Sequence, residues 1–472
     1  MSKSSIVSIS TLVPRNRLVR RPAIGARRCL TLGLALLAAG CSSSTVTEQV
    51  SVSSQFYGTV FAEETQAGIA GRDILLAGGM AGDAAAAIGA ALSLSLPSRA
   101  GLGGGGICLA QSDRRDVEMI DFLPRPAAGS ALQIPGMVRG LAALQARYGT
   151  LRWQQVLAPA ERLAALGVKA GPTLLADMRR AGLTMNGAGG GPLKEGDILR
   201  QEGTAAILAG IRLNGASDFY TGALAKRLVQ AGLPGTDLAA FVPTWQPPLM
   251  IAANGASATL PASSAGVMQK AVWQALEADR DRAADPAQRL TLAHATGAQV
   301  LTSLAQGATV DAASDAGSTG FVVIDAHGGA VACSLTLGGL FGSGQTIGGL
   351  DILAARPVTA QSVEALSLAP VIITTRDKKD LVAAVVANGS PAAAVDEASA
   401  LYAALAARRT VPFADAVAAP RSAEDKPSPA TAVADRISGL VCPDGFFGDA
   451  TTCSTARDPR GSGIILQAVR EK

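Results

Sequence analysis

The chain has 472 residues, 48% of them hydrophobic and 17% charged, a composition that suits a large buried core and excludes a disordered protein. Its formal net charge is only +4, and the basic excess lies in the first 40 residues, which hold seven Lys/Arg and no Asp/Glu. Taking these seven from the 41 basic residues leaves 34 against 37 acidic ones, so we expect no nucleic-acid partner.

Residues 1–41 predict an export signal. The basic residues precede an apolar run, Leu30–Ala39, which is too short to span a bilayer. The segment Leu37-Ala38-Ala39-Gly40-Cys41 resembles a bacterial lipoprotein cleavage box and predicts a lipid anchor on Cys41, on the periplasmic side of the membrane. The alternative is a plain secretory signal that is cut near Ala39.

The segment that follows predicts a tether and then a buried helix. Residues 42–58 are rich in Ser, Thr and Val and predict a flexible tether. Asp83 opens an Ala-rich stretch, where a carboxylate suits the positive end of a helix dipole, and Pro97 ends it. Gly101–Gly106 then runs directly into a strand, the reverse of the order in a phosphate-binding loop. We therefore reject nucleotide binding and expect a close approach of backbones or of a ligand.

The middle of the chain is predicted to be mainly helical, because apolar residues recur at three-and-four spacing. The expected helices are Met137–Tyr148, Arg152–Leu166, Pro172–Ala181, Gly203–Leu213, Leu224–Ala231, Met268–Ala278 and Pro286–Gly307. A proline cluster at Pro243–Pro248 is expected to close this layer, and Leu249–Leu260 predicts one strand.

A hairpin in the second half of the chain starts with hydroxyl residues. Phe321–Asp325, a His327-Gly328-Gly329 turn and Ala330–Leu337 predict two antiparallel strands, with Gly317-Ser318 at their start. An N-terminal-nucleophile hydrolase needs this placement, because cleavage before a Ser or Thr frees an α-amine that serves as the base for the adjacent hydroxyl. The alternative is a Ser-Thr pair that caps an ordinary hairpin.

Strands at both ends of the sequence, with helices between them, predict a layered αββα sandwich rather than a doubly wound sheet. Further strands are expected at Pro370–Thr375, Leu381–Ala387 and Ile464–Val469, with a helix at Ala392–Ala407.

The cysteines suggest one disulfide. Cys442 and Cys453 flank a loop and are predicted to pair in an exported protein. Cys108 and Cys333 lie in apolar runs and are predicted to be buried and inert. No spacing suggests a zinc site, and we expect no metal and no cofactor.

Many motifs occur in the order found in one family. GGMAGDAAAAIGAALSLSLPSRAGLGGGG, IPGMVRGLAALQARYGTLRWQQVLAPAERLAALG, DFYTGALAKRLV, LFGSG, LAPVIITT, NGSP and DPRGSG together resemble the γ-glutamyltransferase (glutathione hydrolase) family of the N-terminal-nucleophile hydrolase superfamily. The resemblance implies a four-layer αββα fold (α/β, or α+β) built from a large-subunit-like part, 59–317, and a small-subunit-like part, 318–472. It also implies autocleavage between Gly317 and Ser318.

The resemblance assigns roles to several residues. The nucleophile falls on Ser318, with Thr319 next if the register slips by one. Ser334 and Thr336 match hydroxyls that lie beside the nucleophile. Ala392 and Ala393 stand where the family has the Gly-Gly pair whose N–H groups form the oxyanion hole.

The substrate-binding residues differ from the family pattern. Leu123 replaces the Arg that grips the substrate carboxylate, and Arg125 lies two residues further on. Gly338 replaces a substrate-binding Asn, and of two consecutive serines only Ser367 remains. These losses predict altered recognition of γ-glutamyl groups.

Two functions remain open from the sequence. The first is an exported, self-processing amide hydrolase or acyl transferase that acts on a small-molecule amide or peptide, possible substrates being glutathione or other γ-glutamyl compounds. The alternative is a catalytically inactive envelope lipoprotein that uses the scaffold to bind a ligand or partner.

Overall fold

The computed structural model describes residues 54–471, apart from 113–114, 188–189, 306–313, 379, 407–410, 422–434 and 449–451. The predicted export signal, Cys41 and most of the predicted tether lie outside the described residues. The tether prediction is wrong at its C-terminal end, because β1 (Ser54–Ala62) begins inside the range 42–58. Within the described residues, no helix combines the length and apolarity needed to cross a bilayer.

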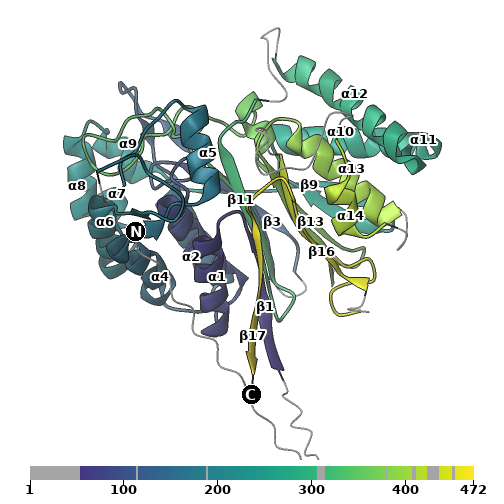
Figure 1. The fold of residues 1–472 in the computed structure, drawn as a ribbon, viewed down its shortest axis with the longest axis horizontal. Helices are drawn as coiled ribbons and strands as arrows, with labels where there is room; N and C mark the ends of the chain where they lie inside the picture. The colour runs from purple at the N-terminus through teal and green to yellow at the C-terminus, as the bar shows by residue number, and fades with distance from the viewer. Residues whose placement is uncertain are drawn as a thin grey trace, which may run out of the picture. The chain divides into compact units, whose positions relative to one another are not determined.

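Two antiparallel sheets form the centre of the fold (Figure 1). The first has the strand order β17-β1-β11-β12-β2-β3-β8 and the second β16-β15-β14-β13-β10-β9. The strands of the first sheet are β1, β2 (Gly105–Gln111), β3 (Glu118–Asp121), β8 (Thr244–Gln246), β11 (Ser318–Asp325), β12 (Ala330–Thr336) and β17 (Ile464–Glu471). Those of the second are β9 (Leu249–Ala253), β10 (Ala256–Leu260), β13 (Ala369–Thr375), β14 (Leu381–Asn388), β15 (Arg436–Val441) and β16 (Ser454–Arg457). Each sheet therefore combines strands from before and after Ser318.

Helices cover the outer face of each sheet (Figure 1). On the side of the first sheet are α1 (Thr65–Leu76), α2 (Ala81–Ser95), α3 (Met137–Tyr148), α4 (Trp153–Leu166), α5 (Pro172–Arg180), α6 (Glu202–Asn214), α7 (Asp218–Thr221), α8 (Ala223–Gln230) and α9 (Gly235–Ala240). On the side of the second are α10 (Ser264–Ala278), α11 (Arg280–Ala284), α12 (Pro286–Ala305), α13 (Ala393–Ala406) and α14 (Phe413–Ala418). The predicted four-layer αββα sandwich is confirmed.

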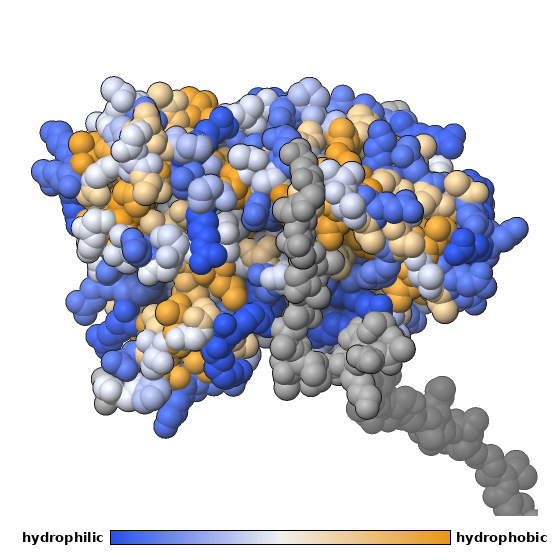
Figure 2. Space-filling view, turned by 90° about the horizontal axis from the view of Figure 1, so that it is seen from above, coloured by the Kyte–Doolittle hydropathy of each residue, from blue (hydrophilic) through white to orange (hydrophobic). Residues whose placement is uncertain are grey.

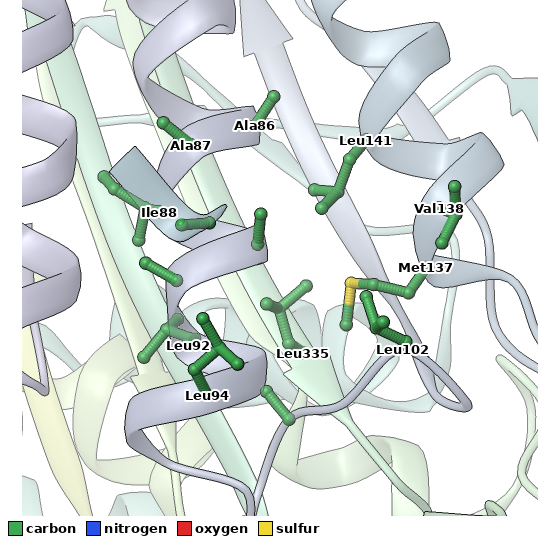
Figure 3. Close-up of a cluster of buried hydrophobic side chains, with 14 of the residues drawn as sticks. Ala86, Ala87, Ile88, Leu92, Leu94, Leu102, Met137, Val138, Leu141 and Leu335 are labelled. Carbon is green, nitrogen blue, oxygen red and sulfur yellow. The ribbon is translucent and has the colours of Figure 1, made fainter. Parts of the chain in front are cut away.

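The side chains of β11 point alternately to the two faces of the first sheet, and this explains how the layers pack. Val322 and Ile324 belong to the apolar cluster between the two sheets, whereas Phe321 and Val323 belong to the cluster under α2. In Figure 3, Leu335 of β12 lies among the side chains of α2 and α3, including Leu92. Because β11 is covered on both faces, its eight residues are all buried.

Apolar side chains are also found at the surface. On the face shown in Figure 2, hydrophobic groups are interspersed with hydrophilic ones. Among the described residues, Leu166, Leu213 and Val242 are the most exposed large hydrophobic ones, at 74%, 63% and 65%. Single exposed apolar residues of this kind are common on folded proteins and do not by themselves indicate a binding surface.

The four glycines Gly103–Gly106 allow neighbouring backbones to touch. A Cβ on Gly103 would lie 2.0 Å from the carbonyl oxygen of Leu353, and one on Gly104 2.3 Å from that of Thr336. On Gly105 it would lie 2.1 Å from the carbonyl oxygen of Phe122. Of the two sequence interpretations, a close approach of backbones is therefore the one that the structure shows.

One predicted strand is wrong, and one observed strand was not predicted. Leu249–Leu260 is not one strand but the hairpin β9–β10, which turns at Asn254-Gly255. Both residues have positive φ angles, 47° and 94°, which is typical of an Asn-Gly hairpin turn. The proline cluster at Pro243–Pro248 also contains a strand that was not predicted. This is the edge strand β8, which pairs with β3.

Cys108 and Cys333 are buried, as predicted, but they are paired, which the sequence did not suggest. They lie opposite each other on the neighbouring strands β2 and β12 and form a disulfide. Their apolar surroundings gave no sign of pairing, because the two cysteines are 225 residues apart in sequence. Cys442 and Cys453 form the disulfide expected from the sequence.

Gly105→Ala should lower the free energy of unfolding by about 3 kcal/mol, since the added methyl group would overlap backbone atoms that cannot rotate away. Gly191→Ala is the control, because a Cβ there meets nothing within 4 Å and the φ angle is not positive. Denaturant titration measures both variants. Equal stability of the two would contradict the backbone contact at Gly105.

Candidate active site

The chain is continuous through Gly317-Ser318, and this junction is buried. Ser318 is the first residue of β11 and pairs with Thr336 of β12, which in turn pairs with Gly105 of β2. Gly317 has a φ angle of 66°, and a Cβ there would lie 2.3 Å from the carbonyl carbon of Gly339. Only glycine fits this position, so the backbone geometry requires a glycine immediately before Ser318.

The hydroxyl group of Ser318 has two backbone partners. It donates a hydrogen bond to the carbonyl oxygen of Ser367, over 3.0 Å, and accepts one from the N–H of Gly389, over 3.1 Å. Ser367 ends a short helix, Val363–Ser367, just before β13, and Gly389 follows β14. The second sheet therefore fixes the position of Oγ, and the Ser318 side chain has no exposed surface.

Thr336 contacts the peptide bond before Ser318. Its hydroxyl donates to the carbonyl oxygen of Gly317, over 3.4 Å, and accepts from the N–H of Gly338, over 2.8 Å. A donor on this carbonyl would stabilise the negative charge that develops there if a nucleophile attacked the carbonyl carbon. Thr336 thus contacts the junction through the Gly317 carbonyl and not through the Ser318 hydroxyl, the contact that the resemblance implies.

Thr319 has a different environment from Ser318. Its hydroxyl donates to Oε2 of Glu63, over 3.0 Å. Burial raises the pKa of the Glu63 carboxyl, while Arg436 and Arg99 act in the opposite direction. The hydroxyl of Thr319 is thus bound to a buried carboxylate, whereas that of Ser318 is bound to two backbone groups.

A fully buried arginine next to the junction was missed by the sequence analysis. Arg99 donates from Nη1 to the carbonyl oxygen of Ser318, over 2.9 Å. Its Nε and Nη2 bind Asp177 at 2.8 and 2.7 Å, and its Nη1 and Nη2 bind Asp315 at 3.0 and 2.6 Å. Burial alone would raise the pKa of Asp315, but Arg99 holds it below its ordinary value. Arg99 lies within a resemblance motif, but charge alone gave no sign that it would be buried.

The contact predicted for Ser334 is not found, and the N–H groups of Ala392 and Ala393 have partners in their own loop. Ser334 pairs with Gly320, not Ser318, and its buried hydroxyl has no hydrogen-bond partner among the described residues. The N–H groups of Ala392 and Ala393 donate to Oγ and O of Ser390, over 3.1 Å each. The N–H that contacts Ser318 belongs instead to Gly389, three residues before Ala392.

The predicted substrate-binding residues lie in different places. Arg125 is exposed and donates to Thr244 Oγ1 of the edge strand β8, over 2.7 Å. The carbonyl oxygen of Ser367 accepts a hydrogen bond from Ser318. The hydroxyl of Ser367 donates to the backbone carbonyl oxygen of Glu364. Gly338 has a φ angle of 76° and packs against the backbone of Arg356.

The loop that carries Gly389 is held by a buried carboxylate. Asp435 accepts hydrogen bonds from the N–H and the hydroxyl of Ser390, over 2.6 and 2.8 Å. Burial, and then the nearby carboxylate of Asp396, raise the pKa of Asp435 from 3.8 to about 7. The position of the Gly389 N–H therefore depends on a group that titrates near neutral pH.

A family model described as gamma-glutamyltranspeptidase matches residues 67–133 and 124–288. The glutathione hydrolase proenzyme of Escherichia coli (strain K12) is 32% identical over 204 residues, which are 36% of this chain and 35% of that protein. The glutathione hydrolase proenzyme of Pseudomonas aeruginosa is 28% identical over 291 residues, 55% of this chain and 51% of that protein. The chain thus spans between about a third and a half of the length of these curated relatives.

The crystal structure of cephalosporin acylase from Bacillus halodurans resembles the whole fold. It superimposes with a TM-score of 0.64 and covers 91% of this chain and 99% of its own, at 18% sequence identity. At this sequence identity, the similarity between the two structures concerns the fold alone.

Asp435→Asn should remove a pH dependence of stability. Because the pKa of Asp435 is raised when folded, the folded chain holds a proton that the unfolded chain releases above pH 3.8. That stabilisation is complete below the unfolded pKa and is lost as the pH rises to about 7. The free energy of unfolding of the wild type should therefore fall, relative to Asp435→Asn, between about pH 4 and pH 7 and level off above.

Denaturant titrations across this range measure the difference. Asp281→Asn, which replaces an exposed carboxylate, serves as the control. A constant difference between the wild type and Asp435→Asn at every pH would contradict the raised pKa.

Proposed function

We propose that this chain, which the family match and the curated relatives support as a divergent member of the gamma-glutamyltranspeptidase family, cuts itself before Ser318 and then acts as an amide hydrolase or acyltransferase. The observation that carries the proposal is the environment of Ser318. Its Oγ is held by Ser367 and Gly389, and the preceding carbonyl accepts a hydrogen bond from Thr336.

Self-cleavage would begin with attack of Ser318 Oγ on the carbonyl carbon of Gly317. The C–N bond breaks, the hydroxyl proton ends on the departing amine, and an ester joins Gly317 to the serine oxygen. Water then hydrolyses this ester and leaves a carboxylate on Gly317 and a free α-amine on Ser318. Thr336 would stabilise the oxyanion, since its hydroxyl already donates to the oxygen that becomes charged.

Turnover would use the same oxygen a second time. The α-amine of Ser318 takes the hydroxyl proton while Oγ attacks the carbonyl carbon of an amide substrate, and the proton passes to the leaving amine. The acyl group then passes from Ser318 to water or to another amine. The N–H of Gly389 keeps Oγ in place, so Gly389 acts as a positioning residue.

The substrate is proposed only as a small-molecule amide or peptide. Glutathione and other γ-glutamyl compounds are the first to assay, because the curated relatives are glutathione hydrolase proenzymes. Export with a lipid anchor on Cys41 would place the protein on the periplasmic side of a bacterial membrane.

Ser318→Ala should leave a single uncut chain, because the attacking oxygen is gone. Thr319→Val should still be cut, since the Thr319 hydroxyl contacts Glu63 rather than the junction. Thr336→Val should slow cutting by about 10²-fold, the effect of losing one oxyanion donor. A denaturing gel of each purified variant, sampled over time, measures the rates.

Two outcomes would contradict the proposal. An uncut wild-type chain would favour the catalytically inactive, ligand-binding alternative, because an internal Ser318 has no free amine. Loss of cutting in Thr319→Val with normal cutting in Ser318→Ala would place the nucleophile one residue later.

A further inference from the structure

We propose that the cut protein is a two-chain molecule whose chains stay covalently joined, because the disulfide between Cys108 and Cys333 links the part before Ser318 to the part that begins with it. The proposal rests on the proposed function, since two chains arise only if the bond before Ser318 is cut. It names the partner with which each chain then works, which is the other chain, held by one covalent bond.

The two cysteines lie on opposite sides of the cut. Cys108 is on β2, which precedes Ser318, and Cys333 is on β12, which follows it. The two residues are paired across these antiparallel strands, so their side chains lie next to each other on one face of the first sheet. The disulfide between Cys442 and Cys453 is different, because both of these residues follow Ser318 and so belong to one chain.

The link is already present before the cut. The chain is continuous through Gly317-Ser318, and Cys108 and Cys333 are joined in this uncut state. When the bond forms, the two thiols lose two protons and two electrons to an external disulfide, which is reduced to two thiols. Export, as proposed, brings the chain into an oxidising compartment where such exchange occurs. A chain that folds, forms this bond and then cuts itself releases no free fragment.

The disulfide is protected in the folded protein. Cys108 and Cys333 have no exposed surface, and both belong to the apolar cluster on the side of the first sheet that α2 covers. Thiol exchange requires that an attacking thiolate reach one of the sulfur atoms, so the rate depends on access. A thiol reductant should therefore separate the chains only when a denaturant unfolds them.

The link joins two chains that share the first sheet and the proposed active site. After the cut, β11 and β12 belong to the second chain, while their neighbours β1 and β2 belong to the first. Arg99 of the first chain donates to the carbonyl oxygen of Ser318 in the second. Glu63 of the first chain accepts a hydrogen bond from Thr319 of the second. The disulfide keeps the first chain at a high effective concentration beside the second, so these contacts can form again after the protein opens.

The first experiment compares denaturing gels run with and without dithiothreitol. All samples are full chains with Cys29→Ser and Cys41→Ser, so that the four cysteines of the two disulfides are the only ones left. We expect one species from the unreduced protein and two fragments from the reduced protein. Every gel or mass measurement of the cut must accordingly be made on reduced protein.

Two double variants distinguish the two disulfides. Cys108→Ala with Cys333→Ala should give two fragments even without reductant, whereas the control, Cys442→Ala with Cys453→Ala, should still give one species. If the first double variant does not fold or is not cut, a peptide map of the unreduced parent protein decides the question. The map should contain two peptides that are joined through Cys108 and Cys333 and that dithiothreitol separates. Absence of this pair, or two fragments from the unreduced parent, would overturn the proposal.

The second experiment measures the effect of the link on assembly. The cut protein is unfolded in guanidinium chloride without reductant and refolded by dilution, and circular dichroism follows the recovery. We expect the refolding half-time of the linked protein to be independent of protein concentration. For the cut variant with Cys108→Ala and Cys333→Ala, a tenfold lower concentration should lengthen the half-time roughly tenfold, because two separate chains must meet. A half-time that lengthens on dilution of the linked protein would contradict a covalent connection.

The two proposals fail in different ways. A reduced sample that remains one chain refutes the proposed function. A reduced sample that gives two fragments, together with an unreduced sample that gives the same two, retains the function and refutes the covalent link.

Discussion

The pairing of β11 with β12 fixes most of the geometry at the junction. Because Ser318 lies opposite Thr336, and Thr336 opposite Gly105, the proposed nucleophile, the donor to the Gly317 carbonyl and the tetraglycine segment lie in one row across the first sheet. A slip of one residue in this register would turn Ser318 away from Ser367 and Gly389 and put Thr319 in its place. The apolar residues that follow on β11, which alternate between two separate clusters, oppose such a slip.

Buried charge is the second constraint on this region. The side chains of Arg99, Asp177 and Asp315 are at most 1% exposed, so the charge of each is compensated by the others and not by water. Removing one member of such a group costs about 3–5 kcal/mol, because a charge is left buried without a partner. The residues on both sides of the Gly317–Ser318 bond are therefore held by the same network, Gly317 through Asp315 and Ser318 through Arg99.

The sequence predicted those elements whose pattern is local. The periodicity of Met137–Tyr148 and the hairpin around His327 correspond to α3 and to β11–β12. The Asn254-Gly255 turn was a local signal that was overlooked. The disulfide between Cys108 and Cys333, the burial of Arg99 and the contact of Gly389 with Ser318 could not be derived this way. Each depends on residues that are far apart in the chain and meet only when the two sheets and α5 are assembled.

The position of the cut tests the central claim most directly. The intact mass of the smaller fragment of the purified protein identifies its first residue without any assumption about substrate. The account predicts a fragment that comprises residues 318–472, with its mass unchanged by Thr319→Val except for the substituted side chain. A fragment that begins at any other residue, or a wild-type chain that keeps its full mass, would contradict the assignment of Ser318 as an N-terminal nucleophile.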